Sequence, residues 1–237
     1  MDGTIIAIPA YEPGTGLLAL VSELRQHCDG IVVVDDGSTA AAEIFAQLEE
    51  FPGVTLLRHA QNRGKGAALK TAFAYIRDTF PASFVVVTAD ADGQHLPRDI
   101  RRIADAARLN PGRMILGTRT FRAGTPFRSR LGNLWTCGEF FLLTGVRIAD
   151  TQTGLRAFPA GWIKDLLAIP GNGYGYECRM LVASVRAKRI PVQVPIETVY
   201  LDGNSTSHFK PLADTFRTQA ALFAARFAPL PRGWSSR

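Results

Sequence analysis

Short apolar runs alternate with longer segments of helical periodicity along the first half of the chain. Five runs, rich in β-branched residues, have the length and composition of buried strands. They are Thr4–Ile8, Ile31–Val34, Val54–Leu57, Phe84–Val87 and Met114–Gly117. Between them, apolar residues recur every three or four positions, which predicts helices. These positions are Leu17, Val21 and Leu24, then Ile44, Leu48 and Phe51, then Leu69, Ala72, Phe73 and Ile76, and finally Ile100, Ile103, Ala104 and Ala107.

This alternation predicts an α/β fold, with a mostly parallel central sheet flanked by helices on both faces. With 237 residues, of which 46% are apolar and 20% charged, the chain has the size of one domain. We expect this domain to cover residues 1–228 and residues 229–237 to form a disordered tail. A late strand, Pro191–Ile196, lies between prolines and should therefore be near a sheet edge.

The second half contains a basic segment followed by a long apolar helix. Arg119 and Arg122 begin the basic segment, and the helix is expected through Leu131 and Leu142. Its apolar surface is wider than a single stripe facing the core, which favours deep burial over contact with a lipid. A last helix is predicted by the spacing of Leu212, Phe216, Ala220, Phe223 and Phe227.

Polar loops follow three of the predicted strands. They are Asp35–Ser38, Asn62–Gly66 and Thr88–His95. Because the carboxyl ends of parallel strands share one edge, we expect these loops to converge where open α/β sheets bind ligands. The Asp-x-Asp pair of Asp90 and Asp92 suits Mg²⁺ or Mn²⁺, and such an ion would hold a diphosphate. The alternative is a plain turn in which an aspartate caps the next helix.

Charge and cysteine content narrow the class of protein. The formal net charge of +6 fits anionic partners such as phosphates, nucleic acid or an acidic membrane. No apolar run approaches the roughly 20 residues that a transmembrane helix needs. The three cysteines, Cys28, Cys137 and Cys178, form no CxxC pair, which argues against a disulfide framework and a zinc site. We therefore expect a cytoplasmic protein with reduced thiols.

Five motifs taken together resemble glycosyltransferase family 2, and most closely its polyprenyl-phosphate sugar synthases of the dolichyl-phosphate mannose synthase type. The resemblance implies a GT-A-type nucleotide-sugar-binding fold and a divalent metal, Mg²⁺ or Mn²⁺. It also implies inverting transfer of one sugar from a donor of the GDP-mannose or UDP-glucose type to a polyprenyl or dolichyl phosphate. The motifs are Pro9-Ala10-Tyr11-Glu12, Val34-Asp35-Asp36-Gly37-Ser38, Asn62-Arg63-Gly64-Lys65-Gly66, Asp90-Ala91-Asp92-Gly93-Gln94-His95 and Asp150-Thr151-Gln152-Thr153-Gly154-Leu155-Arg156.

The same resemblance assigns the donor site residue by residue. Glycines in the loop Asn62–Gly66, the lysine loop, would let the backbone approach a phosphate at a helix N-terminus. A metal and a lysine would stabilise the charge that develops on the leaving diphosphate. The implied metal ligands are Asp90, Asp92 and Gln94. The implied donor-binding residues are Pro9, Tyr11 and Glu12 at the nucleobase, Asp35 and Asp36 at the base and ribose, and Asn62, Lys65, Gly66 and Asp90 at the ribose and diphosphate.

The acceptor side is less closely specified. Arg119, Arg128 and Arg130 present guanidinium forks that fit a lipid phosphate, although a solvated basic loop explains them equally well. A phosphate acceptor is already ionised and needs little help from a base. Asp150 is therefore a candidate for orienting the acceptor, beside Asp92 and Arg119 as catalytic candidates, and Glu177 is a possible base or merely a helix N-terminal charge.

A late polar segment completes the predicted site. Ser207, His208 and Lys210 are expected to close over the nucleotide, or else to form a polar turn that caps the last helix. Of the other histidines, His95 follows the metal motif, whereas His27 and His59 look incidental.

Rival functions need motifs that this chain lacks. A nucleotidyltransferase would begin with a glycine-rich loop after the first strand, where this chain has Pro9–Glu12. A dinucleotide-binding dehydrogenase would need GxGxxG there. A non-enzymatic membrane or nucleic-acid module has only the net charge in its favour, so we expect no nucleic acid partner. Transfer to a sugar or small-molecule hydroxyl remains an alternative. A polyprenyl-phosphate acceptor would bring the protein to the cytoplasmic face of a membrane, either directly or through a membrane-anchor subunit.

Overall fold

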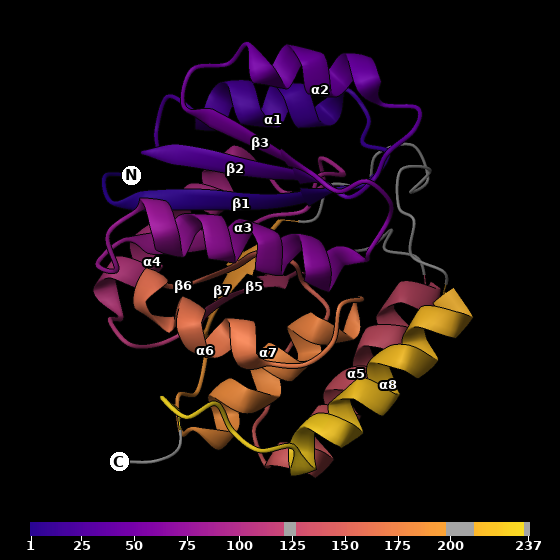
Figure 1. Cartoon of the computed structure of the whole chain (residues 1–237). Helices are drawn as coiled ribbons and strands as arrows, with labels where there is room; N and C mark the ends of the chain where they lie inside the picture. The colour runs from indigo at the N-terminus through magenta and orange to yellow at the C-terminus, as the bar shows by residue number, and fades with distance from the viewer. Residues whose placement is uncertain (121–126, 198–210, 235–237) are drawn as a thin grey trace.

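The computed structural model in Figure 1 describes residues 1–120, 127–197 and 211–234, with side chains except those of residues 127–131 and 211–218. Its centre is a seven-stranded sheet in the order β3-β2-β1-β4-β6-β5-β7. The strands are β1 (Thr4–Ala10), β2 (Gly30–Asp35), β3 (Val54–Arg58), β4 (Val85–Thr88), β5 (Ile115–Arg119), β6 (Arg156–Pro159) and β7 (Val192–Ile196).

All the strands of this sheet except β6 run in one direction. β1 pairs in parallel with β2 on one side and with β4 on the other. β6 lies antiparallel between β4 and β5, and β7 pairs in parallel with β5 at the sheet edge. The prediction of a mostly parallel sheet with a late edge strand is therefore confirmed. The carboxyl ends of β1, β2, β3 and β4 meet at one edge, so the polar loops that follow β2, β3 and β4 lie on the same side of the sheet.

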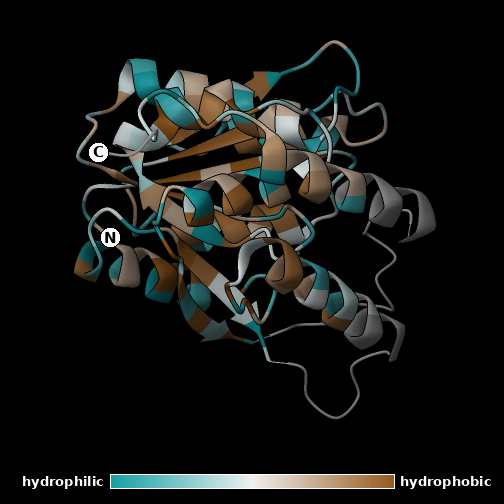
Figure 2. Cartoon of the chain, turned by 90° about the horizontal axis from the view of Figure 1, so that it is seen from below, coloured by the Kyte–Doolittle hydropathy of each residue, from teal (hydrophilic) through white to brown (hydrophobic). Residues whose placement is uncertain are grey.

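Helices cover both faces of the sheet, because side chains of a strand alternate between its faces. Ile5 and Ala7 of β1 pack with α3, α6 and α7, whereas Ile6 and Ile8 pack with α1, α2 and α4. Figure 2 shows the hydrophobic strands enclosed between these layers. The helices are α1 (Gly16–Leu24), α2 (Ala42–Glu49), α3 (Lys65–Thr79), α4 (Pro97–Leu109), the 3-10 helix η1 (Ala160–Trp162), α6 (Ile163–Ala168) and α7 (Gly175–Arg186).

Two long helices, α5 (Phe127–Thr144) and α8 (Pro211–Phe227), lie side by side against α7 and away from the sheet (Figure 1). Phe140 of α5 is fully buried, but other apolar residues of the pair are exposed. The predicted deep burial of the wide apolar helix is therefore wrong for its outer face. We refer to the exposed residues Leu134, Trp135, Leu142, Phe223 and Phe227 as the α5–α8 apolar surface.

The chain after α8 returns to the domain. Trp234 is 2% exposed, and its ring centroid lies 5.0 Å from that of Trp162. The guanidinium carbon of Arg189 lies within 5.1 Å of both ring centroids. The expected disordered tail is thus corrected for residues 229–234, because the packing of two indoles and an arginine holds this segment against η1.

No helix within the described ranges has both the length and the apolar composition to cross a bilayer.

Candidate active site

The loops after β1 and β2 are joined by the carboxylate of Glu12. Its Oε1 accepts hydrogen bonds from the backbone N–H of Thr39 at 2.7 Å and from the Thr39 hydroxyl at 3.0 Å, and its Oε2 accepts from the N–H of Ala40 at 3.0 Å. In return, the N–H of Glu12 donates to the hydroxyl of Ser38 at 2.9 Å. Glu12, predicted to contact the nucleobase, therefore holds two loops in register, and the neighbouring Tyr11 side chain is exposed at their rim.

Asp36 is buried at the end of β2 and holds the lysine loop. Its Oδ1 lies 2.6 Å from Nδ1 of His59 and accepts the backbone N–H of Arg63 at 3.0 Å. Its Oδ2 accepts the N–H of Gly64 at 2.8 Å. The other nitrogen of His59 lies 2.9 Å from the hydroxyl of Thr71 on α3. His59, which looked incidental in the sequence, thus links Asp36 to α3, and both carboxylate oxygens of Asp36 have partners within the protein.

The glycines of the lysine loop make room for a neighbouring loop of the protein. A Cβ on Gly66 would lie 2.6 Å from the Cβ of Tyr176, and one on Gly64 would lie 2.7 Å from the carbonyl oxygen of Asn172. The same oxygen accepts the N–H of Ala67 at 2.9 Å, in the first turn of α3. The predicted reason for these glycines was approach to a phosphate. Packing against residues 172–176 is the reason that the structure provides.

Lys65 begins α3 and bridges two carboxylates. Its Nζ lies 2.6 Å from Oδ1 of Asp90 and 2.7 Å from Oε2 of Glu177. Burial lowers the pKa of Lys65, but the two carboxylates more than offset this and raise it above its usual range. Burial raises the pKa of Asp90, because it disfavours the charged carboxylate. The charges of Lys65 and His95 more than offset this and hold the pKa of Asp90 well below its usual range. Lys65 is therefore charged, and its ammonium lies at the carboxyl end of β4.

Asp92 lies in the same turn, and its charge is poorly compensated. Burial and, next, the negative charge of Asp90 raise the pKa of Asp92. Its Oδ1 accepts the backbone N–H of Gln94 at 3.0 Å, and Nε2 of His95 lies 3.3 Å from the second oxygen of Asp90. The turn thus places Asp92 where burial and the charge of Asp90 disfavour its ionisation, as happens in ion-binding sites.

The donor set fits a hard divalent cation that takes only part of its ligands from protein. Asp90, Asp92 and Glu177 carry three negative charges near the single ammonium of Lys65, so negative charge is in excess. Among the described residues, no three His, Cys, Asp or Glu side chains form a ready-made metal cluster. Mg²⁺ is commonly bound by one or two carboxylates together with water and substrate phosphates, and this arrangement matches that pattern.

The loop before β6 packs against Asp90. The hydroxyl of Thr88 donates to the carbonyl oxygen of Gly154 at 2.7 Å. A Cβ on Gly154 would lie 2.4 Å from both carboxylate oxygens of Asp90. Because this separation is far below a normal contact, any larger residue at position 154 would force Asp90 or this loop to shift. The same loop holds the fully buried guanidinium of Arg156, which donates to the carbonyl oxygens of Thr153 and Glu177.

Asp150 and Arg119 form a second ion pair, in which the carboxylate is buried and the guanidinium is partly exposed. Nε of Arg119 lies 2.6 Å from Oδ2 of Asp150, and Nη2 lies 3.0 Å from Oδ1, which is the bidentate geometry of a strong ion pair. Asp150 is fully buried, and its Oδ1 also accepts the N–H of Gln152 at 3.1 Å. The structure therefore joins two of the predicted catalytic residues, one from β5 and one from the loop before β6.

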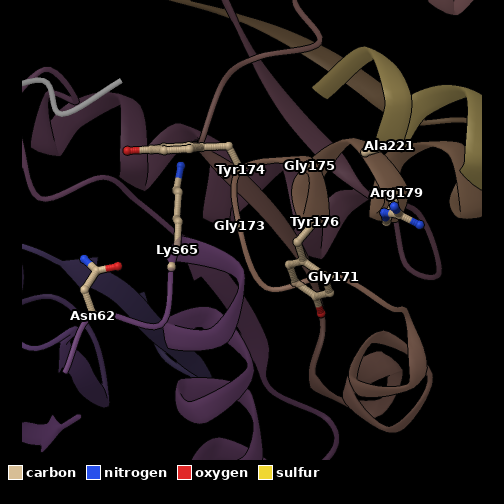
Figure 3. Close-up of a pocket in the computed structure, with 10 residues that line it drawn as sticks. Asn62, Lys65, Gly171, Gly173, Tyr174, Gly175, Tyr176, Arg179 and Ala221 are labelled. Atoms are coloured by element: carbon tan, nitrogen blue, oxygen red, sulfur yellow. The ribbon is translucent and has the colours of Figure 1, made fainter. Parts of the chain in front are cut away.

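A cavity of about 340 Å³ opens beside Lys65. Figure 3 shows the lysine side chain extending toward the ring of Tyr174, with Asn62 on one side and Tyr176 and Arg179 on the other. Gly171, Gly173 and Gly175 contribute only backbone to its wall, beside the ring of Tyr174. The cavity extends as far as Ala221 of α8. It therefore connects the predicted donor side with the helix pair that carries the α5–α8 apolar surface.

The structure brings together most of the predicted site and adds residues that the sequence argument missed. Pro9 and Asn62 lie on the same edge of the sheet as the two acidic turns, which follow β2 and β4. Arg122, the side chains of Arg128 and Arg130, and the segment with Ser207, His208 and Lys210 fall outside the described residues. The missed residues are His59, Gly154, Asn172 and, as the partner of Lys65, Glu177. Only Gly154 and Glu177 belonged to segments already singled out.

Comparisons with known proteins agree with this geometry. Residues 5–164 match glycosyl transferase family 2. A UDP-N-acetylglucosamine–dolichyl-phosphate N-acetylglucosaminyltransferase of Methanococcus voltae is 31% identical over 222 residues, covering 83% of this chain and 86% of the relative. A polyprenol monophosphomannose synthase of Mycolicibacterium smegmatis is 30% identical over 209 residues, covering 81% of this chain and 76% of the relative.

A solved structure gives the same fold. Glucosyl-3-phosphoglycerate synthase from Mycobacterium tuberculosis, in complex with Mn²⁺, UDP and phosphoglyceric acid, matches with a TM-score of 0.69 and 20% identity, covering 95% of this chain and 79% of that one. At this identity the likeness shows the fold alone, and it confirms the expected GT-A-type architecture. The family match covers more than half of the chain, including both acidic turns and the lysine loop. This chain is therefore a member of glycosyl transferase family 2.

Proposed function

We propose that this glycosyltransferase moves one sugar, with inversion at the anomeric carbon, from a nucleotide diphosphate sugar to a polyprenyl phosphate. The names of three relatives specify dolichyl phosphate, undecaprenyl phosphate or polyprenol. The observation that carries the proposal is that both candidate bases are already in ion pairs, Asp150 with Arg119 and Glu177 with Lys65. Because a phosphate acceptor is ionised at neutral pH, its attacking oxygen needs no base. A hydroxyl acceptor would need one.

On the donor side, we assign the diphosphate to Lys65 and to the turn after β4. Asp90, Asp92 and Gln94 are the proposed ligands of Mg²⁺ or Mn²⁺, an ion that would stabilise the charge on the departing diphosphate. Lys65 would donate to the same oxygens from the N-terminus of α3. Stabilisation of this developing charge is what would favour breaking the bond between the sugar and the diphosphate.

The nucleoside is assigned to the loops after β1 and β2. Pro9, Tyr11 and Asp35 lie at the ends of these strands, on the edge that carries Lys65. Glu12 and Asp36 contribute by holding the loops in place, because their oxygens accept hydrogen bonds from backbone N–H groups. Uracil and guanine are the two candidate bases, and the choice between UDP- and GDP-sugars in the transfer assay distinguishes them.

On the acceptor side, Arg119 is assigned to the lipid phosphate, with Asp150 fixing the plane of its guanidinium. Arg128 and Arg130, on the first turns of α5, are assigned to the same phosphate. The Ser207–Lys210 segment is assigned to closure over the nucleotide. The rest of the lipid would lie at a membrane, which the α5–α8 apolar surface is suited to contact.

We assign this membrane contact to the cytoplasmic face of a bilayer. Leu134, Trp135 and Leu142 are exposed on α5, and Phe223 and Phe227 are exposed on the adjoining α8. An apolar helix face of this kind can settle at the headgroup boundary, and nearby basic residues add about 1 kcal/mol each at an anionic surface. The alternative is that a membrane-anchor subunit covers the same surface.

A transfer assay tests the reaction. Purified protein with Mn²⁺ is given radiolabelled UDP- and GDP-sugars and either a short polyprenyl phosphate or a neutral sugar. We expect labelled lipid with the polyprenyl phosphate and none with the neutral sugar. Arg119→Ala should lower this transfer more than it lowers slow hydrolysis of the donor. A good neutral acceptor combined with an inert polyprenyl phosphate would overturn the proposal.

Sedimentation with vesicles tests the membrane contact separately. The protein should pellet with vesicles of phosphatidylglycerol at low salt, and Trp135→Ser with Leu142→Ser should return it to the supernatant. The matched control is Leu109→Ser, because Leu109 is an exposed leucine at the end of α4 and far from this surface in sequence and fold. Equal loss of binding in the control, or no binding by the native chain, would argue for an anchor subunit instead.

A further inference from the structure

Glu177 stands out because it is buried in the site without a role in the proposed reaction. Its side chain is 9% exposed. Glu177 lies in the first turn of α7, and its partner Lys65 is the first residue of α3. Its Oε2 lies 2.7 Å from the Lys65 ammonium. Its Oε1 is buried and has no hydrogen-bond partner among the described residues. A buried carboxylate oxygen without a partner is costly, so its presence calls for an explanation.

The other partner of Lys65 is a proposed metal ligand. Oδ1 of Asp90 lies 2.6 Å from the Lys65 ammonium. An ammonium and a divalent cation on this same oxygen would lie within a few ångströms of each other, and their repulsion disfavours sharing it. Binding of a metal at Asp90 therefore favours release of Lys65 from this carboxylate.

Glu177 is placed to keep Lys65 in the site when this happens. The first turns of α3 and α7 are locked together, since a Cβ on Gly66 would lie 2.6 Å from the Cβ of Tyr176. The backbone of Glu177 is fixed as well, because its carbonyl oxygen accepts a hydrogen bond from the buried Arg156. The distance between Lys65 and Glu177 therefore depends little on what binds at Asp90.

We propose that Glu177 is a positioning residue that takes over Lys65 from Asp90 when metal and nucleotide bind, and so presents the ammonium to the diphosphate. The unpartnered Oε1 supplies the acceptor for the hydrogen bond that Lys65 gives up at Asp90. This inference rests on the proposed function, and it assigns to Glu177 neither proton transfer nor metal binding.

The proposal makes a prediction whose sign differs from that of simple electrostatics. Glu177→Gln removes a negative charge from the site, and a loss of charge alone would strengthen the binding of an anionic diphosphate. If Glu177 instead holds Lys65 in position, the same substitution leaves Lys65 on Asp90 and weakens that binding. We expect the dissociation constant of the nucleotide diphosphate to rise on the order of tenfold, the size of one charged hydrogen bond.

The experiment is calorimetry of UDP and GDP binding to the full chain at saturating Mn²⁺. Glu177→Gln should weaken the binding of whichever nucleotide the native chain prefers, and Glu177→Asp should recover part of it. The matched control is Glu139→Gln on α5, because Glu139 also has a buried oxygen without a partner among the described residues and forms no described ion pair with Lys65. This control should bind nucleotide like the native chain, and thermal unfolding of each variant checks its fold.

A second background separates positioning from other effects. In Lys65→Met there is no ammonium to hold, so adding Glu177→Gln should cause no further loss of nucleotide affinity. Equal weakening in both backgrounds, or unchanged or tighter binding by Glu177→Gln alone, would overturn the proposal. If the native chain itself bound neither UDP nor GDP, the proposed function would fail first, and that outcome is distinct from a failure of the role of Glu177.

Discussion

The two strands on either side of β1 in the sheet, β2 and β4, lead into acidic turns that look alike in the sequence but differ in the structure. In the turn after β2, the oxygens of Asp36 accept backbone N–H groups of Arg63 and Gly64 and meet the ring of His59. In the turn after β4, Asp90 is satisfied by the side chains of Lys65 and His95. Backbone donors are fixed by the fold, whereas side-chain donors can move when a ligand arrives.

This difference separates a carboxylate that builds the site from one that acts in it. Asp36 fixes the loop that leads into α3, so its contribution is to stability and to the position of Lys65. Burial disfavours the charge of both Asp90 and Asp92. Lys65 and His95 offset this at Asp90, whereas the charge of Asp90 adds to it at Asp92, so Asp92 is poorly compensated until a cation arrives. A turn whose carboxylates have only movable or insufficient partners is therefore the better candidate for chemistry.

Asp92→Asn should give the largest effect and would act on function alone. We expect metal-dependent transfer to fall roughly 100-fold or more, the size of losing one electrostatic contribution to the transition state. The thermal unfolding midpoint should stay the same or rise slightly, because the substitution removes a repulsion with Asp90. Transfer assays and unfolding curves of the same preparation measure both. Native turnover by this variant would remove Asp92 from the metal site.

Asp36→Asn should show the opposite profile, with stability affected first. The substitution removes the charge of a buried carboxylate that accepts hydrogen bonds from two backbone N–H groups and lies against the ring of His59. We expect the free energy of unfolding to fall by roughly 2 kcal/mol, and donor affinity to weaken because the lysine loop loosens. Urea denaturation measures the first effect and nucleotide calorimetry the second. A variant with native stability but no nucleotide binding would show that Asp36 contacts the donor directly.

Gly154→Ala tests the support of Asp90 without altering a charged group. The new methyl group would overlap both Asp90 oxygens, so Asp90 or the loop must shift. We expect a loss of roughly 1–3 kcal/mol of stability, as for other overpacked sites, together with weaker Mn²⁺ binding. Gly138→Ala on α5 is the matched control, because a Cβ there meets nothing within 4 Å. Titration with Mn²⁺ followed by electron paramagnetic resonance compares the two, and equal affinities would mean that Asp90 does not need this support.

Thr71→Val should produce the smallest effect. It removes the hydroxyl that lies 2.9 Å from the second nitrogen of His59 and leaves the bond between His59 and Asp36 in place. We expect about 1 kcal/mol of lost stability and unchanged metal affinity, because the metal turn after β4 does not involve this contact. Urea denaturation and the same Mn²⁺ titration measure the two quantities. A loss of metal affinity would mean that the two acidic turns are energetically linked.

Much of the donor half was determined by the sequence itself. Apolar runs such as Ile31–Val34 and Phe84–Val87 are local patterns, and they predicted strands whose carboxyl ends meet at one edge. The strand pattern alone therefore brings the motifs that follow these strands to the same edge of the sheet. The same local logic placed Pro191–Ile196 at a sheet edge, because proline cannot donate to a central ladder.

The partners of the charged groups were decided only by the tertiary structure. Glu177 lies 112 positions after Lys65, and no sequence periodicity links them. The first turns of α3 and α7 nevertheless bring Nζ of Lys65 to 2.7 Å from Oε2 of Glu177. The role of Gly154, in the loop before β6, depends on its contact with Asp90, which lies in the turn after β4. The exposure of Trp135 and Leu142, like the burial of Trp234, depends on which surfaces α5, α8 and η1 leave uncovered. Sequence patterns report the faces of single elements, whereas contacts between distant elements arise only when the chain packs.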